Sequence, residues 1–297
     1  MFNDRYFLIR YTGGSGGDTF SNILNAKING TTNLRARDDH NRSTYDDLFN
    51  MEFTHPVSNK STQEALSLPV KEWREINDDQ LKAVVEYCKH QEPTRRIGKM
   101  HHLFDTRSDY RYVFDGFTVI DLVPPLRSAW IVRALHLFKS ALRMKTDDYT
   151  RFSRIFGLDK EEKFAEHVRL HGWWPEWYVW RGPLSLEQFL TDELTTYHLH
   201  LQSLPPVLDA SVNSLELTLD ESMPWIDKFK NDTGIDLGDE RFREYLRPWI
   251  RKNNEIIDFI GLREHLDADY DWETKNRILQ TNLISMQHEI LKYNKGT

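Results

Sequence analysis

The sequence predicts an α/β protein in which helices flank a parallel sheet. A short run rich in aromatic and strand-favouring residues, at 6–11, leads into a glycine-rich turn and then an amphipathic segment at 18–26. Two further strand-like runs lie at 96–104 and 117–123, and a helical pattern at 77–89 precedes them. Alternation of strands with crossover segments favours a parallel sheet with right-handed connections.

The first half of the chain supplies three of the expected strands. The run FTVIDLV at 117–123 is the strongest candidate because it is almost continuously apolar, and Pro124 and Pro125 end it. Residues 29–65 are polar and rich in Asn, Asp, Ser and Thr, which predicts a long surface excursion.

The second half of the chain is expected to be mostly helical. Residues 214–219 (SLELTL) alternate between apolar and polar side chains, so we expect one more strand there. Ser185 and Gln188 have the spacing of a capping box before a helix. The expected helices cover residues 126–145, 148–171 with a break near Gly157, 189–204, 224–233, 240–259 and 272–293.

The length of 297 residues allows a substantial buried core. The sequence has no internal repeat, low-complexity tract or clear linker. We therefore expect one P-loop-like α/β domain over residues 1–297, with core strands within 1–125 and near 214–220. The segments 126–213 and 221–297 are expected to form a large helical elaboration.

Composition restricts the classes of function. The net charge of −7 argues against a broad nucleic-acid-binding face. No apolar run approaches the ~20 residues of a membrane span, and the first residues lack the pattern of a signal peptide. Cys88 is the only cysteine, which excludes an intrachain disulfide and a cysteine-based metal site. We expect a cytoplasmic protein without a membrane partner.

A glycine-rich loop carries the clearest functional signal. Four glycines between a strand and a helix let backbone N–H groups converge on one point, and the helix N-terminus adds further donors and a positive dipole end. Such a loop suits a phosphate or sulfate group, and a tight turn without a ligand is the alternative interpretation. The candidate binding residues are Thr12, Gly13, Gly14, Ser15, Gly16, Gly17, Asp18 and Thr19.

The loop departs from two well-known nucleotide motifs. A P-loop ends in Gly-Lys-Ser/Thr, whereas this loop ends in Gly17, Asp18 and Thr19. The glycine spacing also fails to match the Gly-x-Gly-x-x-Gly dinucleotide fingerprint. A cation from elsewhere must replace the missing lysine, and the candidates are Lys99, Arg10, Arg127 and Arg133.

The order of segments resembles that of the nucleotide-dependent sulfotransferases. The stretch Ser15-Gly16-Gly17-Asp18-Thr19-Phe20 is similar to the first loop of that family, with one extra residue and no lysine. Lys99-Met100-His101 is similar to the Lys-Thr-His strand of the family, and residues 119–127 resemble a later strand but match only its second arginine, at Arg127.

The resemblance implies a P-loop-like transferase that uses 3′-phosphoadenylyl sulfate. The donor would bind the glycine loop and Arg127, and its sulfuryl group would pass to a hydroxyl acceptor. Lys99 or Arg127 would offset negative charge on the transferring group, and His101 or His102 would act as the general base. Strand parity favours His101, which shares a face with Lys99.

Two other functions fit the same residues. One is an ATP-dependent kinase, which would need Mg²⁺ held by Ser15 or Thr19 with Asp121 as the acidic strand-end residue. The other is a non-catalytic binding or assembly protein, which the missing lysine favours. Asp105 and Asp121 are further candidates for the general base. No metal site is expected under the leading hypothesis.

Overall fold

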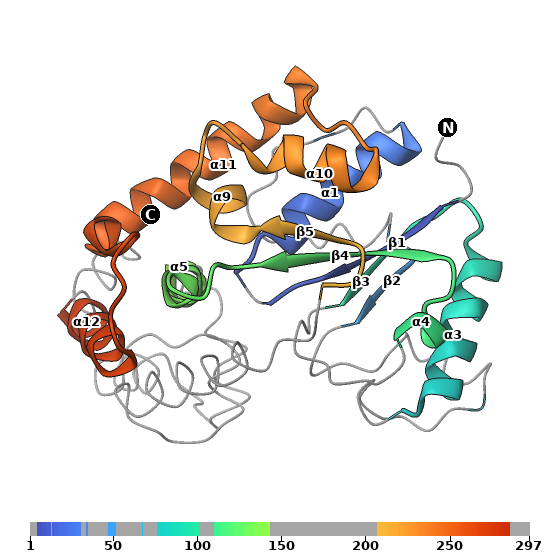
Figure 1. Cartoon of the computed structure of the whole chain (residues 1–297), viewed down its shortest axis with the longest axis horizontal. Coiled ribbons are helices and arrows are strands. Elements are labelled where there is room, and N and C mark those ends of the chain that lie inside the picture. The colour runs from blue at the N-terminus through green and yellow to red at the C-terminus, as the bar shows by residue number, and fades with distance from the viewer. Residues whose placement is uncertain are drawn as a thin grey trace, which may run out of the picture. The chain divides into compact units, whose positions relative to one another are not determined.

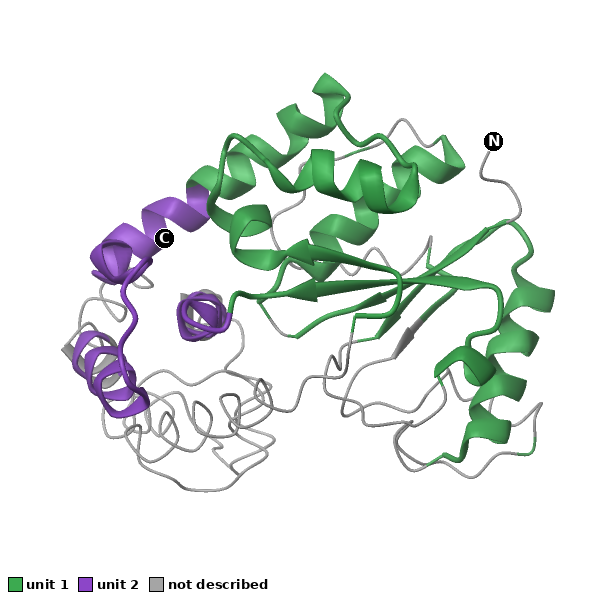
Figure 2. Cartoon of the chain, in the orientation of Figure 1, with its two compact units in different colours: residues 1–125, 203–251 green, residues 126–202, 252–297 purple. Residues whose placement is uncertain are grey.

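The structure is a computed structural model of the chain (Figure 1). The chain divides into two compact units, which Figure 2 shows in different colours, and each unit is described separately. The first unit comprises Met1–Pro125 and Ser203–Arg251, and the second comprises Leu126–Gln202 and Lys252–Thr297. The described residues are 5–12, 14–30, 34, 47–51, 67, 76–100, 110–142 and 207–285.

A five-stranded parallel sheet forms the centre of the first unit, with strand order β2-β3-β1-β4-β5. Neighbouring strands pair in parallel throughout. The α/β class and the parallel sheet expected from the sequence are therefore confirmed. The strands are β1 (Tyr6–Arg10), β2 (Phe49–Met51), β3 (Ile97–Met100), β4 (Phe117–Val123) and β5 (Ala210–Asn213).

The register brings the three expected strands side by side. Residue Ile9 of β1 lies beside Lys99 of β3 on one side and Ile120 of β4 on the other. Most apolar side chains of the three strands are buried, as expected for strands covered on both faces, and Tyr6 and Val123 at the strand ends are partly buried.

Helices cover both faces of the sheet (Figure 1). On one face, apolar residues of β1 and β4 form a core with α1 (Gly17–Asn29), α9 (Ser214–Leu219), α10 (Trp225–Thr233) and the first part of α11 (Glu240–Phe259). On the other face, a second core joins Leu8 and Val119 to α3 (Asp78–Gln91) and α4 (Tyr110–Val113).

The strand expected at 214–219 is wrong, because these residues form the helix α9. Asn213 starts this helix: its side-chain oxygen accepts hydrogen bonds from the backbone N–H groups of Leu215 and Glu216. The strand lies just before it, at Ala210–Asn213, where β5 pairs with β4. The alternating leucines indicated the two-residue period of a strand. The buried residues Ser214, Leu217 and Thr218 instead follow the three- and four-residue spacing of a helix.

The second unit contains the described helices α5 (Ala129–Leu142) and α12 (Trp272–Ser285) and the 3₁₀ turn Arg263–His265. The ring of His265 lies against Trp130 and Tyr270, with centroid separations of 6.3 and 5.5 Å. Within the described ranges, no helix is both long enough and apolar enough to cross a membrane.

Candidate functional site

The glycine loop leaves the sheet at its topological switch point. The connection from β1 to α1 starts at the carboxyl end of the central strand, with β3 on one side of that strand and β4 on the other. Ligands of open α/β sheets bind beyond the carboxyl ends of the strands at such a point. The fold therefore puts the loop at the edge where a ligand is expected.

Hydrogen bonds inside the loop fix its turn. The backbone N–H of Ser15 donates to the carbonyl of Thr12 at 3.1 Å, and the two hydroxyl oxygens lie 2.7 Å apart. Ser15 is fully buried. Gly16 adopts a φ of 81°, a left-handed conformation that glycine takes without strain.

Gly17 is required by packing against Tyr11. A Cβ at Gly17 would lie 2.2 Å from ring atoms of Tyr11, a distance that real contacts do not reach. A Cβ at Gly16 would lie 3.0 Å from Leu217 and Trp249. The close packing of Tyr11, Leu217 and Trp249 is thus sufficient to require glycine at positions 16 and 17, with or without a bound ligand.

The N-terminus of α1 has no side-chain cap. Its N-cap is Gly16, which makes no capping hydrogen bond, whereas Asn77 caps α3 in a capping box and Asn213 caps α9. The first-turn N–H groups of a helix need acceptors from outside the helix. The helix N-terminus of α1 follows the glycine loop directly, which is a position that suits an anion.

Lys99 is brought to the loop from the neighbouring strand. It follows Ile97 by two residues and shares its face of β3, on the side that α1 covers. Its ammonium lies 2.7 Å from Oδ1 of Asp18 and 2.8 Å from Oδ2 of Asp47. The Lys99 side chain is only 1% exposed. Among the described contacts of the candidate cations, the ion pair of Lys99 with Asp18 reaches the loop segment.

The two carboxylates determine the charge of Lys99. Burial lowers the pKa of its ammonium, but the charges and hydrogen bonds of Asp18 and Asp47 outweigh burial and raise that pKa above its ordinary value. Lys99 is therefore protonated at neutral pH. For Asp47 the main effect is burial, which raises the pKa of the carboxyl, while Lys99 and Ser21 oppose it.

Asp47 was not found from the sequence. Besides Lys99, its carboxylate accepts hydrogen bonds from Ser21 at 2.9 Å and Asn25 at 3.0 Å. Ser21 and Asn25 lie four residues apart, so they share one face of α1. This pair of polar side chains on one helix face is the sequence signal that could have indicated a buried acceptor such as Asp47. Asp47 thus fixes both α1 and Lys99.

Arg10 and Asp121 form a second buried pair at the same edge of the sheet. The Arg10 guanidinium donates to both carboxylate oxygens, at 2.6 and 2.7 Å, and lies 4.4 Å from the ring centroid of Tyr110. Burial raises the pKa of the Asp121 carboxyl, and the hydrogen bonds from Arg10 oppose that rise. The Asp121 carboxylate is thus held by Nε and Nη2 of Arg10, while Nη1 of Arg10 is buried without a hydrogen-bond partner among the described residues.

The other candidate site residues belong to the second unit or lie outside the described residues. Arg127 belongs to the second unit, where its exposed guanidinium lies 3.8 Å from Asp267. Its part in donor binding stays a prediction. His101, His102, Gly13 and Asp105 lie outside the described residues.

In the described part of the chain, no group of three or more His, Cys, Asp or Glu side chains converges as a metal site. The carboxylates nearest the loop are Asp18 and Asp47, and both contact the ammonium of Lys99. The described residues alone therefore offer no ready magnesium site at this edge.

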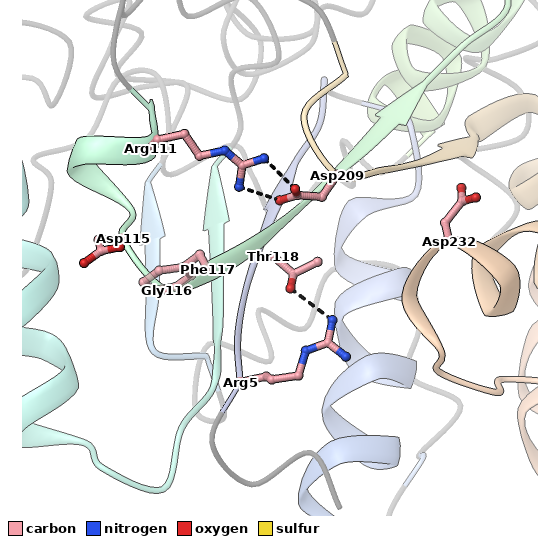
Figure 3. Close-up of a pocket in the computed structure, with 8 residues that line it drawn as sticks. All are labelled: Arg5, Arg111, Asp115, Gly116, Phe117, Thr118, Asp209 and Asp232. Carbon is pink, nitrogen blue, oxygen red and sulfur yellow. Dashed lines mark hydrogen bonds and ion pairs between the residues drawn. The ribbon is translucent and has the colours of Figure 1, made fainter.

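A polar cavity of about 510 Å³ lies at the opposite, amino edge of the sheet. Figure 3 shows Arg111 paired directly with Asp209 and Arg5 reaching Thr118. Its lining residues are Arg5, Arg111, Asp115, Gly116, Phe117, Thr118, Asp209 and Asp232.

The charged groups of this cavity largely satisfy one another. Arg111 donates to both oxygens of Asp209, and Asp232 pairs with Lys228 at 2.6 Å. Phe117 is 4% exposed, so its ring offers little surface for stacking. The amino-edge cavity is therefore polar, but its charged groups are largely engaged by neighbouring side chains.

Comparison with known proteins finds no matching family model, no matching curated protein and no matching solved structure. The resemblance to the sulfotransferases therefore rests on the residues of the chain itself.

Proposed function

We propose that the chain binds the anionic part of a nucleotide at the glycine loop and transfers a sulfuryl group from 3′-phosphoadenylyl sulfate to a hydroxyl acceptor. The observation that carries the proposal is the position of Lys99. Its ammonium contacts the first residue after the four glycines, at the switch point of a parallel sheet.

In this proposal the backbone holds the donor. The uncapped N-terminus of α1 supplies N–H donors and the positive end of a helix dipole. Lys99 supplies the positive charge that a P-loop lysine supplies elsewhere. His101 or His102 takes the proton of the acceptor hydroxyl as it attacks sulfur, and the leaving phosphate departs with the electron pair of the broken S–O bond.

The kinase alternative has less support. It relied on Asp121 as a magnesium ligand, and Asp121 is buried in a two-point pair with Arg10. The non-catalytic alternative keeps one supporting observation, which is that Lys99 is buried and already neutralised by carboxylates.

Thermal unfolding in the presence of nucleotides tests the proposal. We expect 3′-phosphoadenosine 5′-phosphate to raise Tm by roughly 5 °C or more at a hundredfold excess over Kd, because ligand binding to the native state alone contributes about 2.7 kcal/mol under those conditions. Adenosine, which lacks the anionic groups, serves as the matched control and should leave Tm unchanged.

The same screen separates the alternatives. Stabilisation by Mg-ATP but not by 3′-phosphoadenosine 5′-phosphate would support the kinase instead. No stabilisation by either nucleotide would refute both transferases and favour the non-catalytic protein.

A further inference from the structure

The helix α5 of the second unit begins at a serine whose hydroxyl is not used for capping. Ser128 is the N-cap residue, because its carbonyl accepts hydrogen bonds from the backbone N–H groups of Ile131 and Val132, at 3.0 and 3.4 Å. The side chain of an N-cap serine ordinarily accepts a hydrogen bond from the first turn as well. In the described part of the chain, however, Oγ of Ser128 has no hydrogen-bond partner, although the residue is only 1% exposed.

Trp130 places a second buried donor at the start of the same helix. Its indole Nε1–H can only donate, and it has no acceptor among the described residues, although Trp130 is 3% exposed. Helical side chains lean toward the helix N-terminus, so the indole of Trp130 and the hydroxyl of Ser128 share the first turn of α5. A buried donor without an acceptor is costly, and two of them at one helix start indicate an acceptor from outside the helix.

The segment after α11 holds the indole and leaves a cation beside it. The ring centroid of His265 lies 6.3 Å from that of Trp130, and Nδ1 of His265 lies 3.1 Å from the hydroxyl oxygen of Tyr270. Arg127, one residue before the N-cap, is 59% exposed and lies 3.8 Å from the fully exposed Asp267. A solvent-exposed pair of this length is weak, so the Arg127 guanidinium can also attract an anion.

The groups at the start of α5 suit a negatively charged acceptor. The N–H groups of Ala129 and Trp130 lie in the first turn, where a helix provides no acceptor of its own, and the positive end of the helix dipole lies at the same point. A tetrahedral oxyanion presents several acceptor oxygens and a negative charge within a small volume. It can therefore accept hydrogen bonds from the hydroxyl, the indole and the backbone together.

We propose that the start of α5 is a binding site for a phosphate or sulfate group, which accepts hydrogen bonds from the Ser128 hydroxyl, the Trp130 indole and the first-turn N–H groups. Arg127 contributes a positive charge at the edge of this site. The site goes beyond the proposed function, because it belongs to the second unit and requires no ligand at the glycine loop.

An NMR titration of the ¹⁵N-labelled full chain tests the site. Inorganic phosphate and methyl phosphate are the probes, and sodium chloride at equal ionic strength is the control. We expect either probe to cause saturable shifts of the Trp130 indole N–H and of the backbone amides of Ala129 and Trp130, whereas chloride causes none. The Trp130→Phe variant identifies the indole signal. Tighter binding of methyl phosphate would indicate an esterified ligand, and tighter binding of inorganic phosphate would indicate the free ion.

Ser128→Ala tests the role of the hydroxyl in binding. This variant should bind both probes on the order of tenfold more weakly, because it removes one hydrogen bond to a charged group. Ser214→Ala is the matched control, since Ser214 also has a buried hydroxyl without a hydrogen-bond partner but belongs to the first unit. It should leave both affinities at the Trp130 signal unchanged.

Thermal unfolding without phosphate or sulfate separates a ligand-binding serine from an ordinary cap. Because the Ser128 hydroxyl makes no capping hydrogen bond, Ser128→Ala should leave Tm unchanged. Asn77→Ala removes a capping side chain from α3 and should lower Tm by about 2 °C.

Three results would overturn the site at α5. They are the absence of saturable shifts at residues 128–130, equal affinities of Ser128→Ala and the wild type, and a loss of Tm in Ser128→Ala as large as that in Asn77→Ala. Phosphate-induced shifts at residues 14–19 without shifts at 128–130 would refute this site and leave the proposed function standing. The titration of the wild type decides the question even if a variant fails to fold.

Discussion

At the scale of single residues, Lys99 joins the sheet, the helix α1 and the glycine loop. Its ammonium contacts Asp18 at the end of the loop and Asp47 before β2, and almost none of its surface is exposed. A buried ion pair is costly to break, because removing one partner leaves the other charge without compensation in a medium of low dielectric. Lys99 therefore acts on stability as well as on any ligand.

We expect Lys99→Met to lower the free energy of unfolding by about 3–5 kcal/mol, because it leaves the buried Asp47 carboxylate without its cation. Adding Asp47→Leu should recover part of this loss by removing the uncompensated charge. Urea unfolding followed by circular dichroism measures both changes.

Lys228→Met is the control, since Lys228 pairs with Asp232 at the surface. This variant should cost no more than about 1 kcal/mol. Equal costs for the Lys99 and Lys228 variants would contradict the buried ion pair.

At the scale of elements, Asp209 ties three elements together before β5 begins. Its carboxylate accepts hydrogen bonds from Arg111 of α4 and from the backbone N–H of Val119 in β4, at 2.9 and 2.8 Å. Partial burial raises the pKa of Asp209, but these hydrogen bonds outweigh it and bring the pKa below its ordinary value of 3.8.

A carboxyl group with a lowered pKa stabilises the fold while it is ionised. The contribution of Asp209 should be fully present above pH 3.8 and should be lost as the pH falls through the lower pKa of the folded state. Asp209→Asn should therefore be less stable than the wild type at pH 7, by about 1 kcal/mol given the partial exposure of this side chain.

Chemical unfolding at pH 7 and at a series of lower pH values measures this difference. The gap between wild type and variant should narrow only below pH 3.8. A gap that stays constant down to pH 2 would show that the charge of Asp209 has no such role.

The sequence predicts the elements that carry long, uniform patterns and misses the short ones. The apolar runs of β1 and β4 and the long amphipathic helix α11 are recognisable because many residues share one pattern. β2 has three residues, Phe49–Met51, inside a polar stretch, and only pairing with β3 makes it a strand. β5 has four residues, and its last residue caps the next helix.

The same limit applies to the candidate site. The glycines identify the loop because their spacing between a strand and a helix is local in sequence. The partnership of Lys99 with Asp47 joins residues 52 positions apart and depends on the packing of α1 over the sheet, so no local pattern predicts it. Asp121 looked like a free strand-end acid, whereas its pairing with Arg10 follows from the register of β1 against β4.

At the scale of the first compact unit, the sheet has two chemically different edges. The carboxyl edge carries the glycine loop, an uncapped helix N-terminus and a buried lysine. The amino edge carries the polar cavity of Figure 3, whose arginines and aspartates are largely paired with one another or with nearby residues. A nucleotide that binds this chain should therefore bind at the carboxyl edge.

An amide NMR titration of the ¹⁵N-labelled chain with 3′-phosphoadenosine 5′-phosphate tests this claim most directly, because it reports where the ligand binds without any substitution. We predict saturable shifts of the backbone amides of residues 14–19, with those of Gly116 and Thr118 at the amino edge unchanged. Shifts confined to the amino-edge cavity, or no saturable shift at 14–19, would contradict the assignment of the glycine loop as the binding site.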